Sequence, residues 1–172
     1  LREGWEFRKC DEKQRAFRAD PANVGRLDYV QQIKKEMEVI EAKDFVDYFL
    51  IVSDIVKFSK DSGIPVGPAR GSAAASLVCY LLRITEVNPM LFPNMMFERF
   101  VDHNREDLPD IDLDFDDERR HEVFEYAAQK YARAYVGKIG TFTTFKAKHA
   151  VDDVAYVYRI PKGRGQQVKE VR

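Results

Sequence analysis

Three aspartates alternate with apolar residues in the segment 108–115, which reads Leu-Pro-Asp-Ile-Asp-Leu-Asp-Phe. The aspartates are Asp110, Asp112 and Asp114. In an extended strand successive side chains point to opposite faces, so the three carboxylates would share one face while the apolar side chains enter a core. Like charges about 7 Å apart repel, and a divalent cation with oxygen ligands, such as Mg²⁺, would relieve that repulsion. The alternation therefore predicts a strand with a metal-binding face, and the alternative is a solvated acidic edge strand.

The same aspartates match the first three ligand positions of an EF-hand calcium loop. The sixth position of that loop should be glycine and is Phe115, and the twelfth should be glutamate and is His121. The alternating apolar residues also fit a strand better than a calcium loop. The sequence therefore excludes an EF-hand.

A second informative stretch, 67–77, combines glycines and small residues with one arginine. It predicts a loop that runs into a helix with Ser72 as its N-cap, and a helix N-terminus offers unpaired N–H groups and a positive dipole end to a phosphate. Arg70 adds a bidentate donor. The loop is not a Walker motif, because its glycines are four residues apart and no lysine follows Gly71. A phosphate-binding loop and a simple helix cap both remain open.

The pattern of the rest of the chain predicts the elements that would position these two motifs. Residues 1–25 are expected to be irregular with room for a short helix, 48–52 a buried strand, 64–66 a short extended piece and 109–115 the acidic strand. Helices are expected over 26–42, 53–62, 73–83, 118–135 and 145–158. Mixed strands and helices indicate an α+β or α/β domain.

Composition is that of a soluble globular protein, with 45% hydrophobic and 33% charged residues. No apolar run approaches the roughly 18 residues that a membrane span needs. The two cysteines, Cys10 and Cys79, lie far apart and lack metal-type spacing, which favours a reduced cytoplasmic protein. The chain does not begin with methionine, so we expect a piece of something larger.

The net charge of −1 conceals an asymmetry along the chain. Residues 1–118 carry 16 basic and 24 acidic side chains, whereas residues 119–172 carry 12 basic and 5 acidic ones. An acidic, metal-type cluster followed by a basic segment suits a protein that handles phosphates and grips a polyanion, although solvated helices show such swings too. Taken together, the glycine loop and the aspartate strand are the two halves expected of a nucleotidyl-transfer site.

Four motifs together carry a resemblance to a known family. They are Tyr48 to Val52, Gly-Ile-Pro-Val-Gly-Pro-Ala-Arg-Gly-Ser (63–72), Phe-Glu-Arg-Phe (97–100) and the acidic octapeptide 108–115. In order and spacing they resemble the catalytic alpha subunits of bacterial replicative DNA polymerase III, over roughly residues 26–160. The resemblance implies an α+β fold with a polymerase-beta-like nucleotidyltransferase palm over 1–138, its mixed sheet flanked by helices, and a helical thumb that starts at 139–172.

The resemblance also implies roles for individual residues. Asp110 and Asp112 would be catalytic carboxylates that bind two Mg²⁺ ions, with Asp114 in support. The incoming deoxynucleoside triphosphate (dNTP) would contact Arg70, Gly71, Ser72, Arg99 and Tyr48, although core packing is equally open for Tyr48. Primer–template DNA would contact Lys138, Lys146 and Lys148. The implied activity is template-directed DNA synthesis in replication, with the rest of the polymerase chain or a companion chain, a sliding clamp and other replisome subunits as partners, and no membrane.

This chain departs from the family pattern at several points. Ala69, Ala73 and Ala75 stand where the family often has glycine, which makes the loop stiffer and bulkier. The resemblance places the third catalytic aspartate beyond Arg172, so we expect the chain alone to be inactive. Two alternatives stay open: a truncated, non-catalytic relative that binds DNA or a replisome partner, and an unrelated nucleotidyltransferase with a small acceptor, which the basic carboxy-terminal part disfavours.

Overall fold

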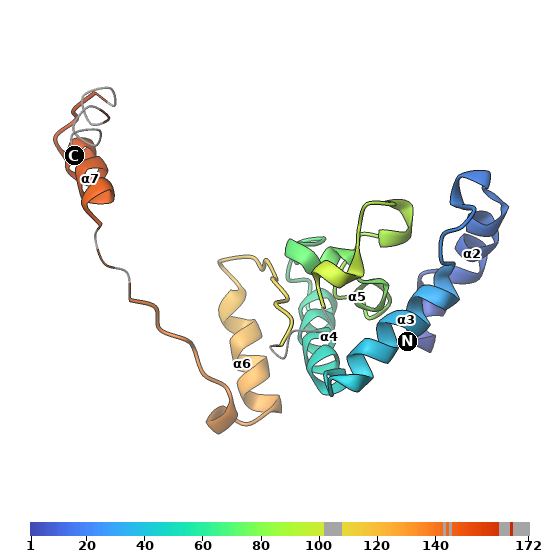
Figure 1. Cartoon of the computed structure of the whole chain (residues 1–172). Helices are drawn as coiled ribbons and strands as arrows, with labels where there is room; N and C mark the ends of the chain where they lie inside the picture. The colour runs from blue at the N-terminus through green and yellow to red at the C-terminus, as the bar shows by residue number, and fades with distance from the viewer. Residues whose placement is uncertain (102–107, 143, 145, 162–165, 167–172) are drawn as a thin grey trace. The chain divides into compact units, whose positions relative to one another are not determined.

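A computed structural model describes residues 1–101, 108–142, 144, 146–161 and 166. The chain divides into two compact units, Leu1–Val136 and Gly137–Arg172. Figure 1 shows the helices of both units. The α-helices are α1 (Arg2–Phe7), α2 (Cys10–Ala19), α3 (Tyr29–Ala42), α4 (Val46–Asp61), α5 (Leu77–Leu81), α6 (Arg120–Lys130) and α7 (Ala147–Val157). Short 3₁₀ helices are η1 (Pro21–Asn23), η2 (Gly71–Ala75), η3 (Pro89–Leu91), η4 (Phe97–Arg99) and η5 (Arg133–Tyr135).

The predicted α+β palm with a mixed sheet is wrong. Over the described residues the first unit is built from helices and irregular segments, and its only β-type pairing is one isolated antiparallel bridge between Val66 and Phe115. The predicted acidic strand therefore exists only as an extended segment that touches one short partner. A sheet needs a neighbour along each strand, and sequence alternation alone does not supply one.

The predicted strand at 48–52 is instead part of α4. The buried residues of α4 are Phe49, Ser53, Val56 and Ser59, which recur every three or four residues as on one face of a helix. Leu50 and Ile51, which suggested a strand, are 52% and 40% exposed. The prediction failed because two of the four buried positions are serines, which hide the helical period from a reading based on hydrophobic residues.

Residues 1–25, predicted to be irregular, form α1, α2 and η1. The side chains of Cys10 and Phe17 on α2 are buried in a core cluster with Tyr29 of α3 and Leu77 and Tyr80 of α5. A Cβ added to Gly4 of α1 would lie 1.9 Å from the carbonyl oxygen of Leu81, so α1 packs backbone-close against the end of α5. These contacts order a polar segment, for which the sequence predicted at most one short helix, into two α-helices and a 3₁₀ turn.

The helix predicted at 26–42 is confirmed as α3, beginning at Tyr29 rather than at residue 26. Its start is fixed by a capping box, in which Asp28 accepts the backbone N–H of Gln31 and the Gln31 side chain accepts that of Asp28. The second core cluster lies where α3, α4, α5 and η4 meet. It includes Val39, Phe45, Phe49, Val78, Ile84, Phe97 and Phe100.

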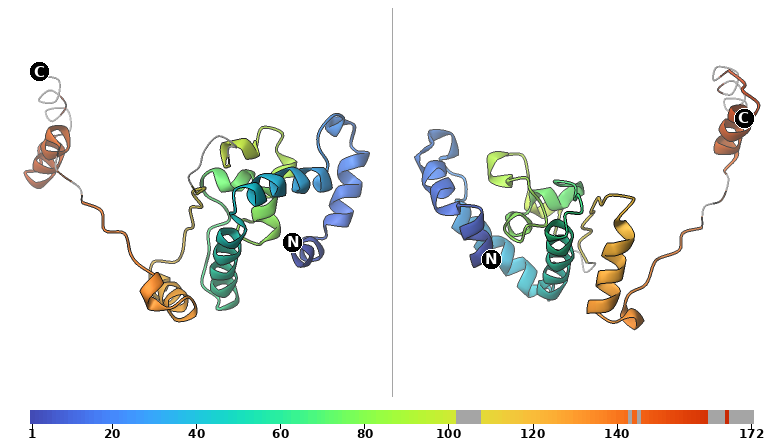
Figure 2. Two further views of the ribbon diagram at one scale, coloured as in Figure 1. Left: turned by 60° about the horizontal axis from the view of Figure 1, so that its bottom comes forward. Right: turned by 180° about the vertical axis from the view of Figure 1, so that it is seen from behind.

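Helix α6 lies beside α4 (Figures 1 and 2). Phe58 of α4 and Tyr126 of α6 stack with their ring centroids 3.8 Å apart. Asp54 of α4 accepts hydrogen bonds from Tyr126, Lys130 and Tyr131 at 2.5–2.9 Å. Helix α6, the element that follows the acidic segment in the chain, is thereby fixed to α4.

In the second unit, α7 contains no buried residue, and Val154, Tyr156 and Val157 are 53–85% exposed. The helix predicted at 145–158 is present over Ala147–Val157. Among the described residues, no helix is both long and apolar enough to cross a membrane.

Candidate functional site

The glycine loop ends in a 3₁₀ helix and not in the α-helix that the sequence predicts. Gly71 has φ +64°, a left-handed conformation that favours glycine, and it opens η2. The predicted N-cap Ser72 is wrong: the N-cap of α5 is Ser76, whose Oγ accepts the N–H of Cys79 at 3.1 Å. The left-handed turn at Gly71 delays the α-helix by four residues, which moves the cap from Ser72 to Ser76.

The acidic segment keeps the predicted alternation of faces although it belongs to no sheet. Asp110, Asp112 and Asp114 are exposed, whereas Ile111 and Leu113 pack against the second core cluster. Three hydrogen bonds hold the segment at its two ends. The Tyr48 hydroxyl donates to the Pro109 carbonyl at 2.8 Å, the Gly67 N–H to the Asp114 carbonyl at 2.8 Å, and the Asp116 N–H to the Pro65 carbonyl at 3.3 Å.

The structure brings the glycine loop and the acidic segment into contact. A Cβ added to Gly71 would lie 2.7 Å from Oδ2 of Asp112, and one added to Gly67 would lie 3.0 Å from Cβ of Asp114. Arg70 donates to Oδ1 of Asp114 at 2.6 Å, and this pairing raises the pKa of the guanidinium. The two glycines are thus the residues that allow the loop backbone to reach the carboxylates.

A hollow of about 340 Å³ adjoins the loop. It is lined by Gly71, Ser72, Ala74, Ala75, Asn94, Met95, Met96 and Arg99. Arg99 reaches it from η4, which packs against η2, so the structure brings Arg99 together with Ser72. Small residues on one wall leave its backbone accessible, and the arginine supplies a positive charge on the other wall.

Tyr48 does not line this hollow. Its half-buried ring packs edge-to-face with Phe49, and its hydroxyl holds the Pro109 carbonyl. Burial raises the pKa of the Tyr48 hydroxyl, so it remains a neutral donor at physiological pH. In this structure Tyr48 supports the acidic segment from beneath.

The donor set of the acidic segment fits a hard cation in type. Asp110 and Asp112 present exposed carboxylate oxygens on one side of the segment, which is the chemistry that Mg²⁺ prefers. Asp114 is engaged by Arg70. In the described part of the chain, no three His, Cys, Asp or Glu side chains are grouped closely enough to hold a metal ion by themselves. Two carboxylates are thus the most that this segment offers one cation.

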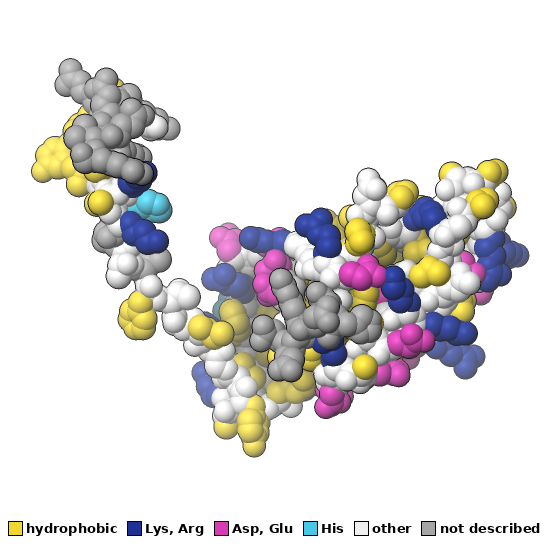
Figure 3. All heavy atoms as spheres, in the orientation of Figure 1, with side chains coloured by type: hydrophobic (Ala, Val, Ile, Leu, Met, Phe, Trp, Pro, Cys, Tyr) yellow, Lys and Arg dark blue, Asp and Glu magenta, His cyan; other side chains and the backbone are white. Residues whose placement is uncertain are grey.

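The predicted DNA-contacting lysines lie in the second unit. Lys138 belongs to an extended stretch, Lys146 precedes α7 and Lys148 lies in its first turn, and all three are exposed. On the face shown in Figure 3, acidic and basic side chains of the first unit intermingle and form no large patch of one sign. A polyanion would therefore find no one-signed surface on that face.

Sequence reasoning missed Glu36, whose side chain is fully buried beneath α5. The signal was present in the periodicity of α3, since Glu36 falls three residues after Ile33 and four before Ile40 on the apolar stripe. A carboxylate on such a stripe must be paired or hydrogen-bonded.

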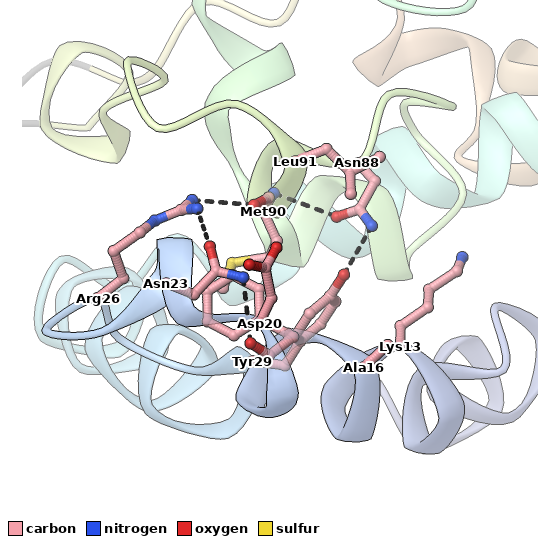
Figure 4. A pocket seen from close by; sticks show the side chains of 10 residues that line it. Lys13, Ala16, Asp20, Asn23, Arg26, Tyr29, Asn88, Met90 and Leu91 are labelled. Atoms are coloured by element: carbon pink, nitrogen blue, oxygen red, sulfur yellow. Dashed lines mark hydrogen bonds between the residues drawn. The ribbon is translucent and has the colours of Figure 1, made fainter.

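Another hollow, of about 290 Å³, lies between the α2–η1 region and η3 (Figure 4). There the amide of Asn88 donates to the Tyr29 hydroxyl at 2.8 Å, and Arg26 donates to the Met90 carbonyl at 2.9 Å and to Asn23. Its main polar side chains bind one another, and none of the predicted site residues lines it.

Comparison with known proteins gives a consistent result. Residues 7–171 match the family model described as the bacterial DNA polymerase III alpha NTPase domain. Proteins named DNA polymerase III subunit alpha are 49% identical over 141 residues in Ureaplasma parvum, 46% over 142 in Bacillus subtilis and 42% over 163 in Escherichia coli O157:H7. These matches cover 81%, 82% and 95% of this chain but only 14%, 13% and 13% of the relatives.

Proposed function

The chain belongs to the bacterial DNA polymerase III alpha family, and from this membership we propose that it is the part of a DNA-directed DNA polymerase that holds the catalytic metal ions and the triphosphate of the incoming dNTP. It spans about one seventh of the length of its relatives, so the activity belongs to the longer polypeptide or to an assembly with a companion chain. Primer–template DNA, dNTPs and other replisome subunits, including a sliding clamp, are the proposed partners.

One observation carries this proposal: the contact between Gly71 and Asp112. Phosphoryl transfer requires a metal ion to be shared between protein carboxylates and the phosphates. A loop that can cradle phosphates and a segment that can hold a metal are separated here by the space of a single Cβ. Chemistry that bridges metal and phosphate therefore has both of its partners in one place.

Asp110 and Asp112 are the proposed ligands of Mg²⁺, with Asp114 in support. The ions would neutralise the charge that develops on the phosphates and lower the pKa of the attacking 3′-hydroxyl. Arg70 is held near this position by Asp114, and a triphosphate oxygen could take the place of that carboxylate on the guanidinium. Ser72 and Arg99 would hold the remaining phosphate oxygens from the two walls of the 340 Å³ hollow.

We assign duplex contact to the second unit, as the start of a thumb. Its lysines would neutralise backbone phosphates without reading sequence. The non-catalytic alternative shares this binding function, so DNA binding alone does not separate the two. Catalysis does.

The test is primer extension with Mg²⁺ and all four dNTPs, using this chain alone and a Bacillus subtilis alpha subunit in which these residues replace the matching segment. We expect no extension by the chain alone and extension by the chimera. Asp112→Asn in the chimera should abolish extension, while Asp117→Asn, at an exposed aspartate two residues beyond the acidic segment, should preserve it. A chimera that folds and binds primer–template yet extends nothing would identify the non-catalytic alternative.

A further inference from the structure

Glu36, on α3, is the one carboxylate among the described residues that is completely buried. Its two oxygens accept four hydrogen bonds. Oε1 accepts from the Gln32 side chain at 2.8 Å and from the Leu77 N–H at 2.9 Å, and Oε2 accepts from the Ser76 hydroxyl at 2.8 Å and from the Val78 N–H at 2.9 Å. All four partners donate, so the surroundings are built for an ionised carboxylate.

The four bonds tie α3 to the start of α5. Leu77 and Val78 are the first two residues of α5, and their N–H groups have no partner within that helix. The next N–H, of Cys79, is accepted by the Ser76 hydroxyl. Burial raises the pKa of the Glu36 carboxyl, and the hydrogen bonds oppose that rise. Burying a carboxylate costs free energy, whereas at an exposed helix end water could accept the same N–H groups.

The start of α5 is directly continuous with the glycine loop. The Ser76 N–H donates to the Ala73 carbonyl at 3.1 Å, and Ala73 is itself buried in the second core cluster. Ala74 and Ala75 line the 340 Å³ hollow. At the start of the same loop, a Cβ added to Gly71 would lie 2.7 Å from Oδ2 of Asp112. A slide of α5 along α3 by about one ångström would therefore move the phosphate loop relative to the carboxylates.

We propose that Glu36 is a positioning residue that fixes the Gly71–Ala75 loop at the distance from Asp112 that the triphosphate site requires. Glu36 touches no substrate, because its side chain is fully buried and does not line the hollow. It acts through the Ser76 hydroxyl and the N–H groups of Leu77 and Val78. This inference rests on the proposed function, since it names what sets the geometry of the same site.

Glutamine is a severe substitution at this position although it preserves shape. Each oxygen of Glu36 accepts from two donors. In Glu36→Gln one oxygen becomes an amide N–H₂ group, which faces two donors and can accept from neither. In the double variant Glu36→Gln with Gln32→Glu, the new carboxylate at position 32 accepts that amide. Only the Leu77 N–H then loses its acceptor, so the double variant should recover part of the loop geometry.

The experiment titrates the ¹⁵N-labelled chain with dATP and Mg²⁺ and follows the amide signals of Gly71 and Ser72. We expect Glu36→Gln to weaken dATP binding roughly tenfold or more, the effect of losing a charge-assisted hydrogen bond. The double variant should regain at least part of that affinity. Glu38→Gln, an exposed substitution on the same helix, should bind as the unmodified chain does. Ser76→Ala removes one of the four bonds to Glu36 and the acceptor of the Cys79 N–H without placing a donor against a donor, and it should weaken binding several-fold in a chain that stays folded.

The outcomes separate the two proposals. If Glu36→Gln and Ser76→Ala bind dATP as tightly as the unmodified chain, the positioning role is wrong and the proposed function stands. If the unmodified chain shows no shift at Gly71 or Ser72 with saturating Mg²⁺ and dATP, the triphosphate site is wrong and the positioning role fails with it. If Glu36→Gln does not fold, Ser76→Ala decides by the same criterion.

Discussion

At Gly71 two requirements meet in one residue. Its φ of +64° lies in the left-handed region, and the space where a side chain would begin is taken by Oδ2 of Asp112. Gly63 has nearly the same backbone angle, φ +68°, but nothing lies within 4 Å of its would-be Cβ. Substitutions at Gly71 and Gly63 therefore distinguish the effect of backbone strain, which both share, from the effect of contact with Asp112, which only Gly71 has.

Gly71→Ala should destabilise the chain and disturb Asp112. The left-handed backbone costs an alanine about 1–2 kcal/mol, and the contact with Asp112 adds to that because the carboxylate must move. Gly63→Ala should show the backbone cost alone. Urea denaturation measures the free energy of unfolding, and Mn²⁺ titration measures metal affinity. We expect Gly71→Ala to lower both the free energy of unfolding and the Mn²⁺ affinity, and Gly63→Ala to lower only the free energy of unfolding. Equal Mn²⁺ affinity in the two variants would show that Gly71 does not influence the carboxylates.

At the scale of elements, the acidic segment is placed by helices and not by a sheet. Tyr48 of α4 holds one end of it, and α6 follows it in the chain. The junction of α4 and α6 is a polar cluster around Asp54 in addition to the stacked rings of Phe58 and Tyr126. Burial of the Tyr131 hydroxyl, together with the hydrogen bond that this hydroxyl donates to Asp54, raises the pKa of Tyr131 to about 12. The cluster is therefore a set of neutral and positive donors around one carboxylate.

Asp54→Asn should loosen α6 from α4. We expect a loss of about 1–2 kcal/mol in the free energy of unfolding at neutral pH, because an amide cannot accept all three hydrogen bonds. Tyr131→Phe should cost less, since it removes one donor, and Glu125→Gln, exposed on α6, should cost little. Denaturation in urea gives the three values. A loss no greater for Asp54→Asn than for Glu125→Gln would mean that the cluster does not hold the helices together.

The same cluster predicts a pH dependence. Burial raises the pKa of Asp54, but hydrogen bonds from Lys130, Tyr131 and Tyr126 outweigh it and leave the pKa below its ordinary value of 3.8. A lowered pKa means that this contribution to stability is complete above the ordinary value and is lost as the pH falls through the lowered one. The difference in unfolding free energy between the unmodified chain and Asp54→Asn should be constant near neutrality and shrink below about pH 4. A difference that persists unchanged at lower pH would contradict it.

At the scale of the whole molecule, the chain consists of two units of opposite character. The first carries the buried clusters and the acidic segment, and the second carries exposed lysines and an α-helix without buried residues. Under the proposed function the first unit prepares metal and triphosphate, and the second contacts the nucleic acid backbone.

Lys146→Glu with Lys148→Glu should weaken duplex DNA binding for every sequence alike. Each lost phosphate contact reduces the steepness of the plot of log affinity against log salt by about 0.9, so the slope of the double variant should be shallower by up to about two. Lys9→Glu with Lys34→Glu makes the same charge change in the first unit and should leave most of the affinity. Fluorescence anisotropy at several salt concentrations measures the slopes. An equal loss in both double variants would indicate a net-charge effect and not a surface on the second unit.

Local patterns in the sequence determined a good part of this protein. The stripe of α3 and the alternation of exposed aspartates with packed Ile111 and Leu113 follow from periods of 3.6 and 2, which neighbouring residues alone impose. The succession of four motifs was enough to reveal the family, because their order and spacing are joint constraints. Residues 48–52 as a strand failed because buried serines hide the helical period of α4, and Ser72 as a cap failed because the left-handed turn at Gly71 moves the start of α5 to Leu77.

Tertiary structure decided how these pieces meet. Whether an extended segment joins a sheet depends on the segments beside it, and here the short stretch around Val66 gives the acidic segment a single bridge. The pairing of Arg70 with Asp114 spans 44 residues, and the bond between Glu36 and Ser76 spans 40. Such contacts arise when the burial of apolar surface folds the chain into one packed arrangement, so side chains distant in sequence become neighbours only after the core has formed.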